Sequence, residues 1–338
     1  MPFPLVVTAN AAVGRPWAGH ATGILAGLTA GVTFLVGALD LGGAGLVSAG
    51  AGGQQFGLDA GIMLTAVVAA TLAARPVRER IARVLPIDAD SPVHAYALVL
   101  AVILLGTQVA TIAFVDVLAA DQEAPPLSLV DLAASEVPFL IMALAGVGLY
   151  IRRNAAGAAE RLGLVRPAWW QIAIALAAAG AFFALIQTAD QLSHIWTPQV
   201  AHQVDQTSQH VFGGLNNPVG IAALALLPGI CEEILFRGAL QPRIGLLATA
   251  VLFASIHTQY GLSLDALSVF VVAIGLGLIR KYTNTTTSCV CHVSYNLLAG
   301  IGLAGSLVGV AVAVELGLVA LSGYAVWANL RRRALPAQ

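Results

Sequence analysis

The stretch Cys231-Glu232-Glu233-Ile234-Leu235-Phe236-Arg237-Gly238 places two carboxylates and a guanidinium inside a long apolar run. A charge at the centre of a membrane helix costs about 2.5 to 3.5 kcal/mol on insertion scales, so ionisable side chains this close together indicate a functional site. The 338-residue chain is 58% hydrophobic and only 10% charged. This composition is typical of an integral membrane protein and excludes an ordinary soluble or disordered chain.

Runs of roughly 20 mostly apolar residues predict membrane-spanning helices. Such runs occur at 21–39, 58–74, 93–115, 132–151, 169–188, 219–240, 244–257, 264–279, 288–304 and 306–330. Arginine and lysine collect in cytoplasmic loops, and in this chain they follow the second, fourth, eighth and last runs. The sequence therefore predicts an all-α, polytopic transmembrane bundle of about ten spans, with both termini in the cytoplasm.

The segment 152–167 is basic and rich in glycine and alanine, and it is the strongest candidate for a domain boundary. The first four runs carry almost no ionisable residue at mid-membrane depth, whereas such residues are concentrated after this segment. We therefore expect an accessory bundle over 1–151, a basic cytoplasmic linker over 152–167 and a catalytic bundle over 168–330. No internal repeat is visible, which disfavours a transporter built from repeated halves.

Charge and composition also bear on partners and location. The net charge is −1 and no basic face with interleaved aromatic residues exists, so nucleic acid is not an expected partner. A single lysine and abundant alanine and glycine suggest a GC-rich bacterial genome, and hence the bacterial cytoplasmic membrane. Residues 1–17 lack the basic region, apolar core and cleavage site of a removable signal peptide. Nothing in the sequence indicates an oligomeric state.

Helical geometry separates the charges of the opening stretch. Glu233 and Arg237 are four residues apart with the acid first, so they share a helix face and can neutralise each other. Glu232 points about 100° away and is left without a partner. Burial in an apolar medium disfavours an unpaired carboxylate, which suits a general base that works near neutral pH.

Two further pairs of polar or aromatic residues lie one helical turn apart. Phe253 precedes His257, and His292 precedes Asn296. A buried carboxylate, a histidine and a His/Asn pair are the groups needed to activate a water and to hold an oxyanion. At 1.5 Å of rise per residue, Glu232 and Asn296 lie roughly 15 and 12 Å from the cytoplasmic ends of their spans. We therefore expect one shared site that opens to the cytoplasm.

Three sets of residues lie in this order on successive apolar helices: Glu232-Glu233 with Arg237, Phe253 with His257, and His292 with Asn296. They resemble the three motifs of the CPBP family, which comprises the CAAX prenyl endopeptidases and bacteriocin-processing enzymes and is also called the Abi family. The resemblance covers about residues 169–300. It implies an intramembrane endopeptidase that acts on a peptide or a membrane protein without a metal or other cofactor. It also implies individual roles: a water-activating base with a histidine partner (Glu232, His257), an oxyanion hole (His292, Asn296) and supporting residues (Glu233, Arg237, Phe253).

Alternative readings remain open at this point. Cys231, Cys289 and Cys291 could join His292 at a zinc site of a membrane metalloprotease, although their spacing matches no common zinc pattern and HExxH is absent. Apolar packing is the favoured role of these cysteines. A non-catalytic scaffold, immunity protein or transporter could also keep the polar cluster. The role of Glu315 and the identity of the substrate cannot be read from the sequence, and Asp265 is interpreted as a helix N-cap.

Overall fold

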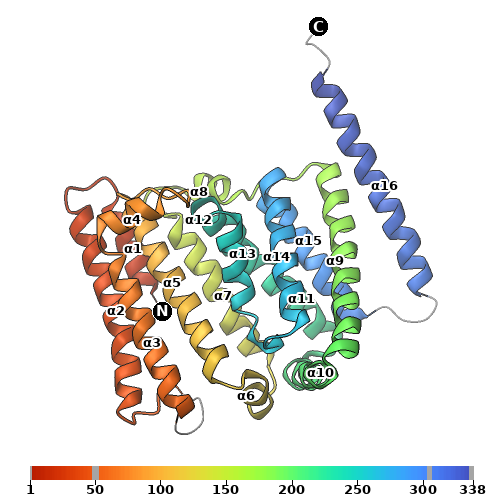
Figure 1. Cartoon of the computed structure of the whole chain (residues 1–338). Coiled ribbons are helices and arrows are strands. Elements are labelled where there is room, and N and C mark those ends of the chain that lie inside the picture. The colour runs from red at the N-terminus through yellow and green to blue at the C-terminus, as the bar shows by residue number, and fades with distance from the viewer. Residues whose placement is uncertain (1, 48–52, 303–306, 335–338) are drawn as a thin grey trace.

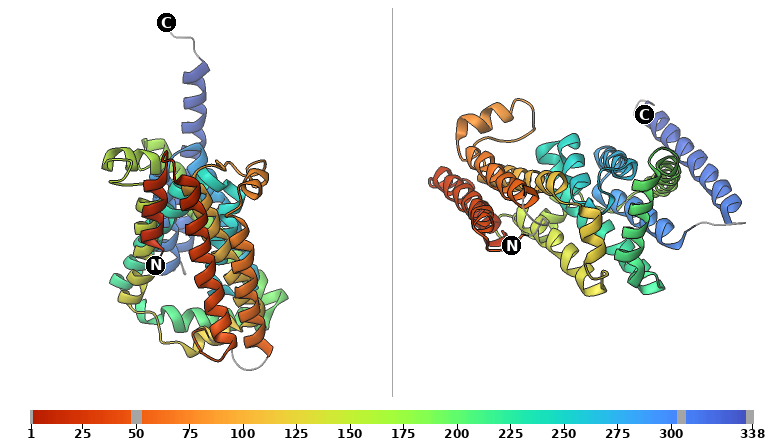
Figure 2. Two further views of the ribbon diagram at one scale, coloured as in Figure 1. Left: turned by 90° about the vertical axis from the view of Figure 1, so that its left-hand side faces the viewer. Right: turned by 60° about the horizontal axis from the view of Figure 1, so that its bottom comes forward.

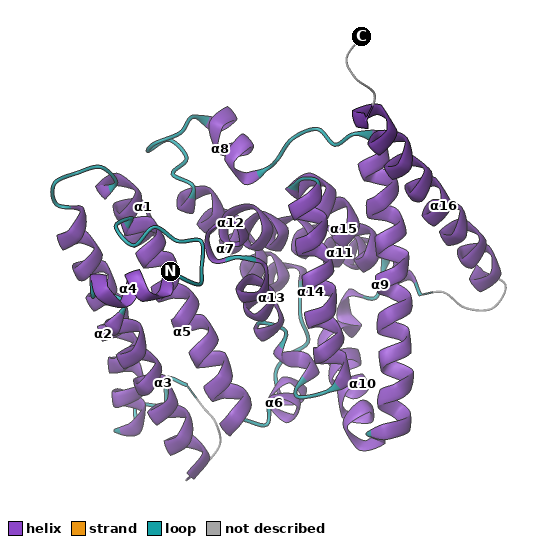
Figure 3. Cartoon of the chain, turned by 45° about the horizontal axis from the view of Figure 1, so that its top comes forward, coloured by secondary structure: helices purple, strands orange, loops and turns teal. Residues whose placement is uncertain are grey.

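The computed structural model describes residues 2–47, 53–302 and 307–334. Within these ranges the regular structure is entirely helical (Figures 1 and 3), and the only β-type pairing is an isolated bridge between Leu149 and Arg153. The predicted all-α fold is confirmed. A helix satisfies its backbone hydrogen bonds within itself, which is what a segment surrounded by lipid requires.

Each of the ten predicted runs corresponds to a helical segment. They are α2 (Ala18–Leu41), α3 (Gly53–Thr71), α5 (Pro92–Phe114), α7 (Leu129–Gly146), α9 (Trp169–Trp196), α11 (Pro218–Glu233) with its continuation through η2 (Ile234–Leu240) and α12 (Gln241–Ile244), α13 (Leu246–Ser255), α14 (Leu264–Tyr282), α15 (Thr285–Ile301) and α16 (Leu307–Ala334).

The number of helices that can cross a membrane is smaller than ten. In the described residues, six are long and apolar enough, or seven if α3 and α4 (Arg75–Ile81), which meet at a bend of 93°, form one span. α13 has only 10 residues, about half the length that a full span needs. The chain is thus a multi-pass membrane protein, while ten spans and two cytoplasmic termini stay predictions.

Short helices lie at the two ends of the bundle (Figure 1). One end carries α4, α8 (Ala155–Leu162) and α12, and the other carries α6 (Val117–Glu123) and α10 (Pro198–Phe212). We call them the arginine end and the acidic end, because the arginines of 75–83 and 152–166 lie at the first and Asp121 and Asp205 at the second. This separation agrees with the loop charges, and the side chains of Arg331–Arg333 lie outside the described residues.

Several helices lie outside the predicted apolar runs, and two of them, α1 (Phe3–Ala12) and α8, have contacts that fix their positions. α1 packs against α2, α5 and α7, where the side-chain amide of Asn10 donates to the carbonyl of Ala145 at 2.8 Å. α8 is held at the arginine end because the Leu162 carbonyl accepts a hydrogen bond from Thr285 Oγ1 at 2.6 Å. Both helices are much shorter than the roughly 20 residues used to predict a span, so the search for apolar runs did not identify them.

Side-chain caps set where the helices around the site begin. Asn217, Ser263 and Asn284 each accept a backbone N–H of the first turn of α11, α14 and α15, respectively. The interpretation of Asp265 as the N-cap is therefore wrong. Ser263 takes that role, and Asp265 lies in the first turn, where it is buried and accepts a hydrogen bond from Ser193 Oγ.

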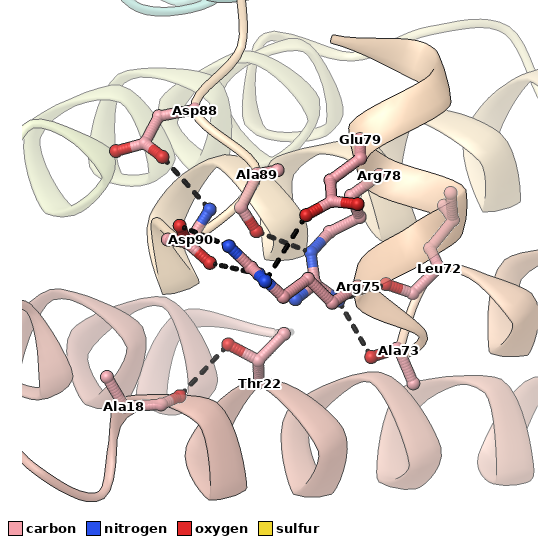
Figure 4. A network of polar contacts seen from close by, with 10 residues as sticks. All are labelled: Ala18, Thr22, Leu72, Ala73, Arg75, Arg78, Glu79, Asp88, Ala89 and Asp90. Carbon is pink, nitrogen blue, oxygen red and sulfur yellow. Dashed lines mark hydrogen bonds and ion pairs between the residues drawn. The ribbon is translucent and has the colours of Figure 1, made fainter.

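The corner between α3 and α5 is fixed by two arginines (Figure 4). Arg78 is buried and donates to the carbonyls of Leu72, Ala73 and Ala89, at 2.7 to 2.8 Å. Burial is the main cause that lowers the pKa of Arg78. Arg75 stays exposed and forms an ion pair with Asp90 at 2.7 Å. These contacts hold α4 against the end of α3 and against the segment that leads into α5.

One buried apolar cluster extends across the predicted linker. It joins Leu25, Tyr96 and Val99 of the N-terminal helices to Phe236 and Phe253 of the C-terminal part. α7 packs directly on α11 and η2, whereas α16 lies at the outer edge of the bundle against α9 (Figures 1 and 2). The division at 152–167 stays a prediction, and the core itself is continuous across it.

Candidate active site

The two adjacent glutamates lie where a long helix changes its winding. α11 begins at Pro218, whose fixed backbone angle suits the first helical turn, and the helix continues to Ile244 over 27 residues. Directly after Glu233 it widens into the π-helical segment η2. π-helical turns are rare and occur frequently at functional sites. This change of winding sets the directions in which Phe236 and Arg237 project.

Glu233 is fully buried, and both of its carboxylate oxygens have partners. Oε1 lies 3.2 Å from Arg237 Nη1 and 3.1 Å from His292 Nδ1, and Oε2 accepts a hydrogen bond from the hydroxyl of Ser288. The ion pair with Arg237 is the one that the four-residue spacing predicted. The two other partners come from α15, so Glu233 connects α11 and η2 to α15.

Arg237 is also buried and joins the first motif to the second. Its Nη2 donates to the carbonyl of Ala273 at 3.2 Å, and its guanidinium carbon lies 4.1 Å from the centre of the Phe253 ring. A cation over an aromatic face is attracted by the electron density of the ring. Phe253 thus has an electrostatic contact as well as a packing role.

Phe253 is the point at which the three motifs meet. Its ring centre lies 4.8 Å from that of His257, 5.9 Å from that of His292 and 5.4 Å from that of Phe236. His257 Nδ1 lies 2.8 Å from the Phe253 carbonyl. Because a carbonyl oxygen only accepts, Nδ1 carries the proton, and Nε2 of the neutral ring is left as an acceptor.

Glu232 differs from its neighbour. Its side chain is 4% exposed, and its Oε2 atom has no hydrogen-bond partner. The carboxylate lies within electrostatic range of Glu136, Glu233, Arg237 and Tyr260. Of these, Arg237 is the only cation, and Glu233 already pairs with it. Glu232 therefore has an oxygen free to bind a further group.

Asn296 lies further along the bundle. α15 runs antiparallel to α11, with Gly229 against Val293 at one level and Ile221 against Gly300 at another. This register places His292 level with Gly229, and Asn296 roughly 10 Å from Glu232 along the axis. The Asn296 amide donates to the Leu224 carbonyl at 3.3 Å. The structure thus gathers Glu233, Arg237, Phe253, His257 and His292, with Asn296 about two turns from Glu232.

Two residues at this site were missed by the sequence analysis. Ser288 lies one turn before His292 and, like it, contacts Glu233. The four-residue spacing, which places Ser288 on the same helix face as His292, could have identified it from the sequence. Glu136 of α7 is 7% exposed, although it belongs to the part of the chain expected to lack buried charge. Glu136 could have been noted from the sequence, because it is an acidic residue inside the apolar run 132–151, just as Glu232 is an acidic residue inside the run 219–240.

Among the residues that the structure describes, the cysteines belong to no group of side chains close enough to share a zinc ion. Cys231, Cys289 and Cys291 are free and buried, and the latter two belong to apolar clusters. In the described part of the chain, the group of His, Cys, Asp and Glu atoms close enough to share a metal is Asp190, His194 and Asp205, at the acidic end. Glu315, whose role was left open, packs against Gly180 of α9 with Oε1 unpartnered.

The fold and the site together define a class: a multi-pass helical membrane protein with a buried Glu–Arg–His cluster among its helices. Comparisons with known proteins agree with this class. Residues 214–298 match the family model of the type II CAAX prenyl endopeptidases, described as Rce1-like. A relative from Bacillus subtilis (strain 168), described as the uncharacterized protein YpbD, is 30% identical over 148 residues. That match covers 43% of this chain and 73% of the relative.

The chain belongs to this Rce1-like branch of the CPBP family, as the three motifs suggested. It is a family of proteases, so at the family level the protein is a peptide hydrolase. No solved structure matches the chain.

Proposed function

We propose that this protein is an intramembrane endopeptidase in which a water activated by Glu232 attacks the scissile carbonyl. The observation that supports this assignment is the contrast between the two adjacent glutamates. Both oxygens of Glu233 are occupied by Arg237, His292 and Ser288, whereas Glu232 is equally buried with Oε2 free. A general base needs a free oxygen to accept a proton, and of these two adjacent glutamates only Glu232 has one.

The proposed reaction conserves protons without a covalent intermediate. Glu232 takes a proton as the water oxygen bonds to the carbonyl carbon. It returns that proton to the amide nitrogen as the carbon–nitrogen bond breaks and the amine leaves. The free Nε2 of His257 accepts a hydrogen bond from the same water and orients it. The negative charge on the former carbonyl oxygen is stabilised by hydrogen-bond donors, in the way of an oxyanion hole.

The donors are His292 and Asn296 in this proposal, and they are not equivalent. His292 Nδ1 faces the Glu233 carboxylate, so in the neutral ring Nδ1 carries the proton and Nε2 is an acceptor. His292 can donate to an oxyanion through Nε2 only as the imidazolium. The Asn296 amide donates in every protonation state, after it exchanges the Leu224 carbonyl for the oxyanion.

The substrate is a peptide segment at or within the bilayer. The name of the family refers to prenylated C-terminal tails, whereas this chain has a bacterial composition. We therefore propose a membrane-proximal peptide or a membrane protein of a bacterial cytoplasmic membrane as the substrate, with access from the arginine end.

A cleavage assay with the purified protein in liposomes and a library of membrane-proximal peptides tests the proposal. Glu232→Gln should lower the cleavage rate by roughly 10² to 10⁴, the usual contribution of a general base. Glu315→Gln removes another unpartnered carboxylate from a membrane helix and should retain the wild-type rate. Full cleavage by the Glu232 variant would contradict the assignment.

The same assay separates the alternatives. Loss of activity in a chelator, with zinc recovered from the purified protein, would support a metalloprotease. If the wild-type protein cleaves neither the library peptides nor co-expressed membrane proteins, the result would support a scaffold, immunity protein or transporter.

A further inference from the structure

A second unpaired carboxylate is buried beside the proposed base. Glu136 of α7 is 7% exposed, and its Oε2 atom has no hydrogen-bond partner. It comes from outside residues 214–298, the region that matches the protease family. A charged group in such surroundings is costly unless it is paired or protonated, so this carboxylate requires a physical explanation.

The packing of α7 on α11 places Glu136 at the level of Glu232. Both helices run from the acidic end to the arginine end, α7 between α6 and α8 and α11 between α10 and α12 (Figure 1). Phe139 contacts Phe236 with ring centres 6.0 Å apart. One turn before this contact lie Glu136 on α7 and Glu232 on α11. Because the helices are parallel, this contact brings the two residues to the same level, and their carboxylates are within electrostatic range of each other.

The nearby charges cannot neutralise both carboxylates. The titratable groups that face the pair are Cys231, Glu233 and Arg237 on α11 and η2, and Tyr260 on η3 (Thr258–Tyr260). Arg237 is the only cation among them and is held by Glu233 at 3.2 Å. Even with His292 as the imidazolium beside Glu233, two ionised carboxylates would therefore leave at least one uncompensated negative charge in an apolar medium. Close carboxylates in such a site share one proton.

We propose that Glu136 is a positioning residue that shares a proton with Glu232. In the resting site, protonated Glu136 donates its O–H to one oxygen of the Glu232 carboxylate, which orients Glu232 and leaves its other oxygen for the water. This role rests on the proposed function of Glu232. The Glu136 proton stays in place during the reaction, since the proton taken from water passes through Glu232 to the leaving amine.

The pH dependence of cleavage tests this role. Glu136→Ala removes the donor that stabilises the Glu232 anion, so the acid limb of kcat/KM should move to higher pH by about one to two units, the size of one hydrogen bond to a charged group. Glu136→Gln retains a donor and should keep the limb near its wild-type position, as should Glu315→Gln. An acid limb that stays in place in Glu136→Ala, or moves to lower pH, would overturn the proposal.

A second measurement does not depend on proteolysis. The infrared spectrum of the purified wild-type protein at neutral pH should contain a protonated-carboxyl band that is lost in Glu136→Gln and retained in Glu315→Gln. An unchanged spectrum in Glu136→Gln would overturn the proton-sharing pair. If the protein shows this band but cleaves no peptide, the proposed function is refuted and the proton-sharing pair is supported. If the protein cleaves peptides but shows no such band, the proposed function is supported and the proton-sharing pair is refuted.

Discussion

At the scale of single residues, the site depends on two adjacent glutamates with opposite surroundings. Glu233 is held by a guanidinium, an imidazole and a hydroxyl, and it acts as a structural link between α11 and α15. Glu232 has no such partners and is the residue available for chemistry. The two identical side chains therefore differ in their polar partners, and we propose that they differ in role for this reason.

Breaking the buried ion pair should be strongly destabilising. Arg237→Leu leaves the Glu233 carboxylate uncompensated in the apolar interior, and the free energy of unfolding should fall by about 3 to 5 kcal/mol. Chemical unfolding in detergent micelles measures the change. Arg75→Leu is the matched control, because Arg75 is exposed and breaking its ion pair should lower the free energy of unfolding by no more than about 1 kcal/mol. Equal effects of the two replacements would contradict the structural role of the pair.

The exposed ion pair at the corner of α4 should give a small, pH-dependent effect. A hydrogen bond from Arg75 holds the pKa of Asp90 below its ordinary value of about 3.9. A carboxyl whose pKa is depressed by folding stabilises the protein above that ordinary value, and the effect is lost as the pH falls through the lower, folded value. Asp90→Asn should therefore lower the unfolding temperature at pH 7, and wild type and variant should converge in acid, once the pH falls below the folded pKa of Asp90. A difference that persists in acid would contradict this account.

At the scale of elements, close helix contacts set the geometry of the site. α11 and α15 approach at Gly229, where a Cβ would lie 2.9 Å from the backbone nitrogen of Val293. Backbone atoms cannot move away without shifting the helix that carries His292 and Asn296. The winding change at η2 has a similar effect on the other side, since it directs Arg237 toward Phe253.

Gly229→Ala should therefore impair catalysis although it improves local helix propensity. We expect a loss of up to roughly a hundredfold in kcat/KM, because a displacement of about 1 Å in a catalytic site can have that cost. Gly309→Ala on α16 is the matched control, since no atom lies within 4 Å of the added methyl group. The cleavage assay in liposomes compares the two. Activity of Gly229→Ala equal to that of the control would show that this contact does not position the site.

At the scale of the whole molecule, the N-terminal helices contribute to the site region. Phe139 of α7 packs on Phe236, and the central apolar cluster includes residues from both sides of 152–167. Arg152 also donates to Asn10 Oδ1 at 2.7 Å, which ties the start of the linker to α1. The two parts are therefore expected to depend on each other for folding.

A split protein tests this dependence. Fragments 1–166 and 167–338, produced together, should associate and retain cleavage activity, because the cut lies beyond the hydrogen bond between Leu162 and Thr285. Fragment 167–338 alone lacks α7 and should be inactive and unfold readily. Co-purification, followed by the cleavage assay, measures both properties. Full activity of the isolated C-terminal fragment would instead support an N-terminal bundle that is separable from catalysis.

Several properties of this protein follow from the sequence alone because their causes are local. Apolar runs predict helices since each helix satisfies its own backbone, and every predicted run corresponds to one. The pair of Glu233 and Arg237 follows from a four-residue spacing on one helix. The motifs that indicated the protease family also lie within single helical turns.

The tertiary structure decided the features that depend on contacts between helices. Ser288 and His292 lie 55 and 59 residues from Glu233, and no periodicity brings them together. Glu136 lies at the level of Glu232 because α7 and α11 pack in parallel with Phe139 against Phe236. Hydropathy shows which residues are buried, but interhelical register determines which buried charges meet. That register is why Glu233 is paired, and why Glu232 is left with a second carboxylate as its neighbour.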